Sequence, residues 1–285
     1  MTTLAGPQLV RARADVAVWR GGTGPAVLLI PTFPDHAIGM LRLAARLADA
    51  GFSATVMSLP GVPPSVPVDG DDYAVPRVAA DAVAVMQALG HERFAVVGHG
   101  WGAEIGYHLG AHAPQHLTTL TAISVPHPAG YAPRRTVFSE QRSAGYAMFL
   151  AYSPAAAEIA AQPAWLTSAL HHWAPGIRRD DWDEVLGWIA DPEVIRVISR
   201  YYRQNLEADL DASVVQVPTT TIHGGQSTVI SPTLFNELGS WFGAGYRRHL
   251  VPHVGQWPHR EDEALVHDLI VASLRDPPAM VEPGA

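Results

Sequence analysis

The sequence predicts an α/β fold, in which a mostly parallel β-sheet carries helices on both faces. Short apolar runs that end in Pro or Gly alternate with longer segments whose apolar residues recur at helical spacing, and this alternation is typical of βαβ units. A strand-like run and a helical run meet at Gly98 to Gly102, where the G-x-x-x-G spacing predicts a sharp turn. The alternation stops between about residues 130 and 209, which are helical in pattern and rich in aromatic residues.

The predicted strands are runs of aliphatic and β-branched residues closed by turn residues, as expected for strands buried in a sheet. Two of them form an edge pair within residues 10–20, and the others lie at residues 25–32, 53–61, 93–100, 117–128, 217–225 and 246–254. Helices with apolar residues at helical spacing are predicted at residues 37–52, 75–91, from 101 onward, 231–243 and 261–274. The sequence therefore divides into a core at residues 1–129 and 210–285 and a helical insertion at residues 130–209.

Composition narrows the classes of function. The chain has 285 residues and a formal net charge of −8, which argues against nucleic-acid binding because that function needs basic patches. The chain has no Cys. It also has no Lys, so that every basic residue other than His is Arg, which indicates GC-rich coding. No apolar run is long enough to span a bilayer, and the first residues lack the apolar core of a signal peptide. We therefore expect a cytoplasmic protein, monomeric or homodimeric, that binds a hydrophobic small molecule and neither nucleic acid nor membrane.

Several short motifs, spread over nearly the whole chain, resemble those of one enzyme family. They are PTFPD at residues 31–35, GHGWG at 98–102, SVPHP at 124–128, YAMFLAYSPAAAE at 146–158, YYRQN at 201–205 and VGQWPHRE at 254–261. Together they resemble the epoxide hydrolase and haloalkane dehalogenase branch of the α/β-hydrolase superfamily, in which the first two motifs are HGFPE and GHDWG. The resemblance covers roughly residues 27–274 and implies an eight-stranded, mostly parallel sheet with a helical cap inserted after the sixth strand.

The same motifs depart from the family at each position that the resemblance implies to be catalytic. Gly100 stands where the family has its Asp nucleophile, Gln256 where it has His, and Ser227, or Gln226 in a shifted register, where it has the acid. Covalent catalysis needs a nucleophile, a base and an orienting group within hydrogen-bond reach. We therefore expect no hydrolysis through a covalent ester. Gly100 is expected to relieve the strain of the turn and to open space for substrate above the sheet.

The resemblance leaves two kinds of polar group in the expected pocket. The main-chain N–H groups of Trp101 and Phe33 occupy the positions of an oxyanion hole, and they either stabilise a developing oxyanion or are vestigial donors satisfied by water. Tyr202 corresponds to a cap tyrosine that donates a proton to an opening epoxide, and Tyr146 lies near the position of its partner. The alternative for both tyrosines is a packing role between cap and core.

Asp35 is the best carboxylate candidate near the oxyanion loop, and its alternative role is the N-cap of a helix beginning near Ile38. Substrate contacts are predicted for Gly100, Gln256, Ser227, Trp257, Phe149 and His127. We expect His99 to be structural and His253 and His259 to be surface residues. His108, His112 and His116 are spaced along one helix like zinc ligands, but their exposed position favours a solvated face. No metal and no cofactor are therefore expected.

The leading functional hypothesis is a cofactor-independent, non-hydrolytic enzyme for a bulky aromatic or polyketide-like natural-product intermediate. Aromatic residues and Met in the insertion suit such a ligand. The expected chemistry is ring closure, carbon–carbon bond formation, elimination or epoxide opening. Two alternatives stay open at this point: a catalytically inactive protein that binds a hydrophobic ligand, and an epoxide hydrolase that activates water without a covalent intermediate.

Overall fold

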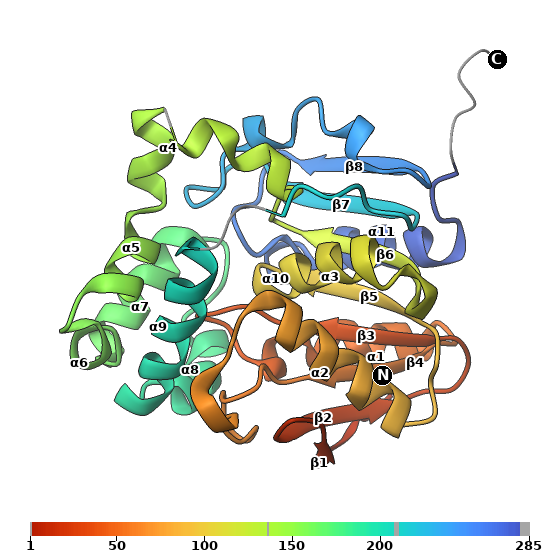
Figure 1. Cartoon of the computed structure of the whole chain (residues 1–285), viewed down its shortest axis with the longest axis horizontal. Helices are drawn as coiled ribbons and strands as arrows, with labels where there is room; N and C mark the ends of the chain where they lie inside the picture. The colour runs from red at the N-terminus through yellow and green to blue at the C-terminus, as the bar shows by residue number, and fades with distance from the viewer. Residues whose placement is uncertain (1, 136, 208–210, 280–285) are drawn as a thin grey trace.

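The computed structural model describes residues 2–135, 137–207 and 211–279, and these contain an eight-stranded sheet (Figure 1). The strands are β1 (Ala5–Arg11), β2 (Asp15–Gly21), β3 (Ala26–Ile30), β4 (Ser53–Met57), β5 (Phe94–His99), β6 (Leu117–Ile123), β7 (Thr219–Gly224) and β8 (Tyr246–Val251). Their order is β1-β2-β4-β3-β5-β6-β7-β8, with β2 antiparallel to both of its neighbours and all other pairs parallel. The predicted fold class is confirmed, including the antiparallel pair at the edge.

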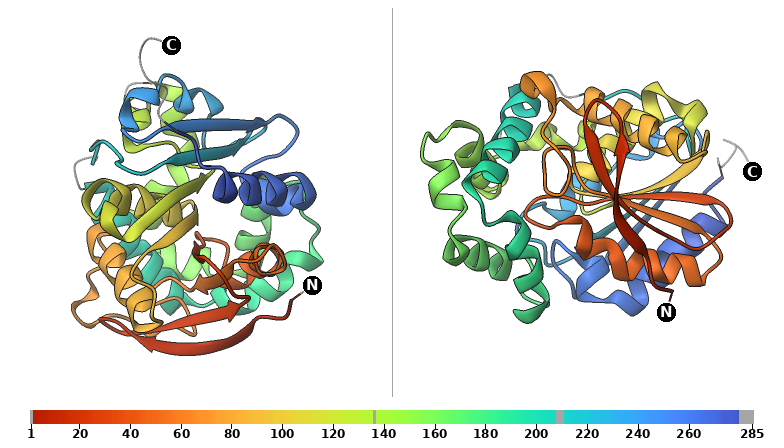
Figure 2. Two further views of the ribbon diagram at one scale, coloured as in Figure 1. Left: turned by 90° about the vertical axis from the view of Figure 1, so that its right-hand side faces the viewer. Right: turned by 90° about the horizontal axis from the view of Figure 1, so that it is seen from below.

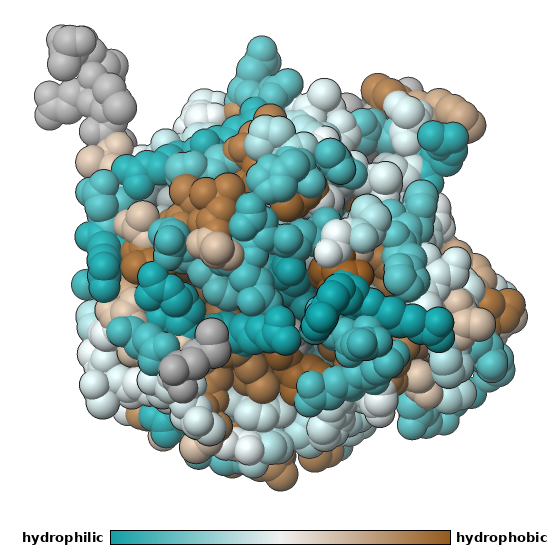
Figure 3. Space-filling model, turned by 180° about the vertical axis from the view of Figure 1, so that it is seen from behind, coloured by the Kyte–Doolittle hydropathy of each residue, from teal (hydrophilic) through white to brown (hydrophobic). Residues whose placement is uncertain are grey.

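Helices cover both faces of the sheet (Figure 2). One face packs on α2 (Val75–Ala88) and α3 (Trp101–His112), and the other packs on α1 (Leu41–Asp49) and α11 (Glu263–Arg275). The residues of β5 are all buried, because a central parallel strand has helices above and below it. Seen from behind, the surface is mainly hydrophilic, with apolar residues in several separate patches (Figure 3).

Between β6 and β7 the described residues form helices and connecting turns without a strand. The helices are η4 (Pro128–Arg135), α4 (Phe138–Ser143), α5 (Gly145–Tyr152), α6 (Ala156–Ala160), α7 (Pro163–Trp173), α8 (Asp180–Ile189) and α9 (Pro192–Glu207). They lie together at one end of the sheet and form a cap (Figures 1 and 2). The predicted boundary between residues 209 and 210 lies outside the described residues.

The YYRQN motif at the end of α9 fastens the cap to the core. The Tyr201 hydroxyl donates to the Pro60 carbonyl at 3.0 Å. Gln204 and Asn205 accept hydrogen bonds from the backbone N–H groups of Tyr73 and Val75, at 2.7 and 2.8 Å. These side chains satisfy backbone donors at the start of α2, where a helix has no internal partners for them.

The helix predicted at residues 231–243 is wrong. This segment instead forms two short 3-10 turns, η5 (Pro232–Phe235) and η6 (Gly239–Trp241). Between them Glu237 has φ of 57°, which is incompatible with a continuing right-handed helix. The remaining elements are short helical turns: η1 (Ala37–Met40), η2 (Asp69–Asp71), η3 (Pro114–His116) and α10 (Pro258–Glu261).

Two glycines let α3 lie directly on the sheet. A Cβ atom on Gly102 would overlap the Ile30 carbonyl oxygen and lie 2.8 Å from its carbonyl carbon, and one on Gly98 would lie 2.6 Å from the Ala103 nitrogen. Each neighbour is backbone and cannot move aside as a side chain could. The G-x-x-x-G spacing therefore fixes how closely α3 approaches β3 and β5.

We predict that Gly102→Ala lowers the free energy of unfolding by about 1–3 kcal/mol, because the added methyl group overpacks a backbone contact. Gly187→Ala is the matched control, since Gly187 lies on the exposed side of α8 with no atom within 4 Å of an added Cβ. The control should be stabilised, by about 0.5–1 kcal/mol. Urea unfolding followed by circular dichroism measures both values, and an unchanged midpoint for Gly102→Ala would contradict this account of the packing.

Candidate active site

Gly100 forms the turn between β5 and α3 and has φ of 54° and ψ of −113°. This backbone conformation is strained for any residue that has a Cβ atom, so the predicted sharp turn is present. A Cβ atom at Gly100 would overlap Thr32 Oγ1 and lie only 2.5 Å from Thr32 Cβ. The expectation that Gly100 opens space for substrate is therefore wrong in this conformation, because the Thr32 side chain fills that space.

Thr32 also changes the state of the predicted oxyanion hole. The Trp101 N–H donates to Thr32 Oγ1 at 3.2 Å, and the Thr32 hydroxyl donates to the Phe33 carbonyl at 3.3 Å. The Trp101 donor is thus neither free nor available to a ligand until Thr32 rotates. Sequence reasoning missed Thr32, although a signal was there: PTFPD has Thr at the position where the similar HGFPE motif has Gly.

Ser227 and Gln256 meet at the ends of the strands, as expected from their positions. The Ser227 hydroxyl donates to Gln256 Oε1 at 2.6 Å, and Gln256 Nε2 donates to the Ser124 carbonyl at 3.2 Å. Ser227 also accepts from the N–H groups of Val229 and Ile230. The pair is a closed neutral network that holds two loops together, and neither side chain can accept a proton as His or a carboxylate would.

Aromatic side chains from the cap converge over Trp101. Tyr202 contacts the Trp101 ring edge-to-face at 5.1 Å and Tyr146 at 5.8 Å, and Tyr146 lies 4.8 Å from Trp173. Phe149 lies at the outer end of this cluster, 6.0 Å from Trp165. The structure therefore brings together four residues predicted for the site from distant parts of the chain.

The space between the cap and the loop after β3 is nearly closed. A cavity of about 10 Å³ lies between the loop that carries Thr32, Phe33 and Asp35 and the cap residues Ile189 and Val194. That volume is enough for about one water molecule. A bulky ligand can enter only if the cap moves or if its aromatic side chains change rotamer.

Known proteins share this architecture. A family model described as "alpha/beta hydrolase fold" matches residues 25–145. Epoxide hydrolase A of Mycobacterium tuberculosis is 25% identical over 277 residues, which cover 83% of this chain and 86% of that protein. The chain therefore has the α/β-hydrolase fold and is similar to proteins of the epoxide hydrolase-like branch of that superfamily.

Two further comparisons agree with the similarity to α/β-hydrolases. An AB hydrolase superfamily protein of Bacillus subtilis is 30% identical over 106 residues, and the match spans only 37% of each chain. The crystal structure of a mutant epoxide hydrolase from Bacillus megaterium aligns over 94% of this chain and all of that chain, with a TM-score of 0.81 and 20% identity. The structural likeness supports the fold alone. Among the described residues, no helix is long and apolar enough to cross a bilayer.

Two residues predicted to contact substrate are packed elsewhere in this fold. His127 is fully buried, donates its Nε2–H to the Ser213 carbonyl at 3.0 Å, and stacks on Trp241. Trp257 is also buried and packs edge-to-face on His99 and Trp182. The rings of His127 and Trp257 thus pack on aromatic side chains other than those that converge over Trp101, and Trp257 meets the cap at Trp182 of α8.

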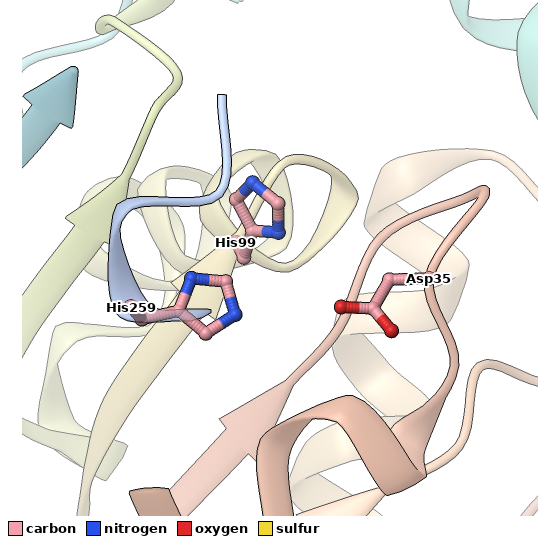
Figure 4. A group of neighbouring side chains, drawn as sticks. All are labelled: Asp35, His99 and His259. Carbon is pink, nitrogen blue, oxygen red and sulfur yellow. The ribbon is translucent and has the colours of Figure 1, made fainter. Parts of the chain in front are cut away.

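A second polar group lies buried behind the turn at Gly100 and consists of Asp35, His99 and His259 (Figure 4). The Asp35 carboxylate accepts from Arg260 at 3.0 Å and from the His36 N–H at 2.8 Å. Asp35 does not cap the next helical turn, because His36 provides that cap. The expectation that His259 lies at the surface is also wrong, since α10 turns its ring inward onto His99 at 4.8 Å.

Burial sets the protonation of this cluster. Desolvation lowers the pKa of His99 to about 4. The pKa of His259 is held well below its usual range, mainly by burial and to a smaller extent by the neighbouring His99 and Arg260. Both imidazoles are therefore neutral at pH 7. The structural role expected for His99 fits its hydrogen bond to the Gln256 carbonyl at 2.9 Å.

The histidines of α3 form a different group from the one that the spacing suggested. His108 and His112 both contact Asp211 Oδ2, at 3.2 and 2.7 Å, whereas His116 bonds to the Glu92 carbonyl. The third member is thus an Asp from the chain returning from the cap. His253 is exposed, as expected, and pairs with Asp262.

The packing of Thr32 on Gly100 predicts that substitutions at these two positions are coupled. Gly100→Asp alone should destabilise the protein, because the new side chain overlaps Thr32, and Thr32→Gly alone should leave a cavity. The double variant should lose about 0.5–3 kcal/mol less than the sum of the two single losses. Urea unfolding of the four proteins measures this coupling, and strictly additive losses would show that the two side chains do not compete for one space.

Proposed function

We propose that this protein is a non-hydrolytic enzyme that closes a ring, or opens an epoxide from within the substrate, on a bulky aromatic or polyketide-like intermediate. The observation that carries the proposal is the pair of cap tyrosines, Tyr202 and Tyr146, which lie 5.8 Å apart against Trp101 above a turn without a nucleophilic side chain. The similarity to epoxide hydrolase A of Mycobacterium tuberculosis suggests that an oxygen-containing ring is a suitable reacting group.

The protein's own groups limit the reaction type. Gly100 provides no nucleophile, and the Ser227–Gln256 pair provides neither base nor acid. Asp35 pairs with Arg260 and lies in the buried cluster with His99 and His259, so we do not assign it as a base for a substrate at the cap tyrosines. A nucleophile must therefore come from the substrate itself, as in ring closure or carbon–carbon bond formation, whereas elimination requires no nucleophile.

Tyr202 is the proposed proton donor. Its ring packs on Trp101, so its hydroxyl is carried by a side chain anchored at the cap–core boundary. A positioned donor can protonate an epoxide or carbonyl oxygen as negative charge develops there. The Trp101 N–H, and by position the Phe33 N–H, would stabilise the same oxygen once Thr32 rotates away.

The aromatic cluster supports a bulky apolar substrate. Tyr146, Trp165 and Trp173 present flat faces and edges that favour offset or edge-to-face contacts with another aromatic system. Such a ligand would displace these side chains and separate the cap from the loop at Thr32. The cap is the element that must move, because the core side of the site is formed by buried strand ends.

One observation favours a second candidate function, a protein that binds a hydrophobic ligand without turnover. The hydrogen bond from Trp101 N–H to Thr32 Oγ1 occupies the donor that anion stabilisation would need. Under this hypothesis Thr32 keeps the Trp101 N–H occupied when ligand is bound, and the tyrosines only line the ligand pocket. An epoxide hydrolase that activates water directly remains the third hypothesis, and its product distinguishes it from the other two.

We predict that an aryl epoxide with a hydroxyl group on the same chain is converted to a cyclic ether of unchanged mass. Tyr202→Phe should lower kcat by about 10²–10⁴-fold with little change in KM, because only the proton donor is lost. Tyr146→Phe should have a smaller effect. Tyr152→Phe is the control, since Tyr152 is exposed on α5 and should keep the full rate. Liquid chromatography coupled to mass spectrometry separates the isomeric product from the substrate and measures turnover, and mass spectrometry of the intact protein detects any covalent adduct.

Each other outcome assigns a different function. Binding of the probe without product supports the ligand-binding protein, and a diol, which carries the mass of one added water, supports direct water activation. A covalent adduct on any residue would contradict the absence of a nucleophile. Turnover that is unchanged in Tyr202→Phe would remove Tyr202 from the chemistry.

A further inference from the structure

We infer that Asp35, His99 and His259 form a buried binding site for a first-row divalent transition-metal ion, such as Zn²⁺ or Fe²⁺. Two imidazoles and one carboxylate are a ligand set that such ions take. The three side chains come from the loop after β3, the end of β5 and α10, and they point toward one another (Figure 4). The inference does not depend on the proposed function.

Counting hydrogen bonds shows that the cluster lacks donors. His99 Nε2 faces the Gln256 carbonyl and must carry its proton, which leaves Nδ1 as an acceptor. Neutral His259 has one N–H and one acceptor nitrogen, and Asp35 Oδ2 is a third acceptor. Among the described residues, none of His99 Nδ1, Asp35 Oδ2 and the two His259 nitrogens has a hydrogen-bond partner. Three buried acceptors therefore share a single N–H, and a buried acceptor without a partner is costly.

The spacing of the acceptors fits one central atom. One ligand atom from each residue lies within 4.8 Å of the other two, so a central atom would lie within about 2.8 Å of all three, close to hydrogen-bond length. Zn–N and Zn–O distances are about 2.0–2.2 Å, so small side-chain movements complete the coordination. A bound cation satisfies all three acceptors by itself, whereas a water molecule could do so only together with the His259 N–H.

The surroundings hold the ligand atoms in place. The His99 N–H is fixed by a backbone carbonyl, and Asp35 Oδ1 is held by Arg260 and the His36 N–H, so that Oδ2 is left for the cluster. Metal-binding imidazoles and carboxylates are commonly oriented by such outer hydrogen bonds. Both histidines are neutral at pH 7 because of their burial, and neutral imidazole is the form that binds metal.

A polar pocket lies next to the cluster. It has a volume of about 130 Å³, and its charged lining consists of Arg42, Arg260 and the acidic residues Asp180, Asp181, Glu184 and Glu263, beside Gly39. Gly39 lies directly against the Asp35 carboxylate, where a Cβ atom would overlap it. The acidic lining attracts a cation and offsets the charge of Arg260, which already pairs with Asp35.

An ion at this position would connect three segments that carry site residues. Asp35 is in the same loop as Thr32 and Phe33, His99 immediately precedes Gly100, and His259 follows Trp257. Binding would therefore fix the spacing between the two main-chain donors without touching substrate. The three ligands are positioning residues in this account.

The test compares metal binding at the buried cluster and at the surface group of His108, His112 and Asp211. His112→Ala removes the surface group and serves as the background. Chelator-treated His112→Ala protein is titrated with Co²⁺ while visible absorption is recorded, and Zn²⁺ retained after gel filtration is measured by plasma mass spectrometry. We expect one bound equivalent and a ligand-field spectrum typical of nitrogen and oxygen ligands.

Adding His259→Gln or Asp35→Asn to the background should weaken Co²⁺ binding at least about tenfold, as loss of a metal-orienting or metal-binding group does. If His112→Ala binds no metal, or if the added substitutions leave binding unchanged, the inference is overturned. Circular dichroism and urea unfolding check that each variant is folded. If the double variants do not fold, nuclear magnetic resonance of the histidine protons in the His112→Ala protein decides the question. The resonances of the two buried histidines should shift when Zn²⁺ is added, and unchanged resonances would overturn the site.

Discussion

The contact between the turn at Gly100 and the side chain of Thr32 governs the chemistry that this site can perform. The turn itself depends on Gly98 and Gly102, which let α3 approach β3 and β5 so closely that Gly100 takes a conformation with positive φ. At the apex, Thr32 occupies the space of the absent side chain and accepts the hydrogen bond from Trp101 N–H. The fold thus keeps the strained turn of an α/β-hydrolase while its most reactive position is filled by a neighbouring hydroxyl.

The groups around the turn have changed together. Gly100 and Thr32 are complementary in volume, and Ser227 and Gln256 form a neutral hydrogen bond of 2.6 Å where the resemblance places an acid and a base. Each exchange leaves its local structure satisfied, with buried polar groups paired, as a stable interior requires. The cap, by contrast, retains its tyrosines and an aromatic lining. The described residues therefore place aromatic cap side chains above a turn whose apex carries no side chain.

The buried cluster behind the turn has a different physical character. Asp35, His99 and His259 present three acceptors for one N–H in a region without solvent, and this imbalance is the reason to infer a bound cation. Arg260 links the cluster to the cap, since it pairs with Asp35, donates to the Asp181 carbonyl at 2.6 Å and lies 4.0 Å from the Trp182 ring. Movement of α8 with the cap would thus reach Asp35 through Arg260.

The sequence by itself determined the fold. A strand or helix that is buried in a layered sheet needs apolar residues at a fixed local spacing, and that spacing can be read directly from the sequence. It also located Gly100, Gln256, Ser227, Tyr202 and Tyr146, since each sits in a short motif at a fixed place relative to a strand or helix. Only the tertiary structure decided which side chains fill the space at the turn and which are buried. Thr32 lies far from Gly100 in the sequence, and His259 follows a turn whose direction no periodicity specifies. Contacts between the ends of parallel strands join residues of unrelated sequence position, so their geometry emerges only when the sheet is assembled.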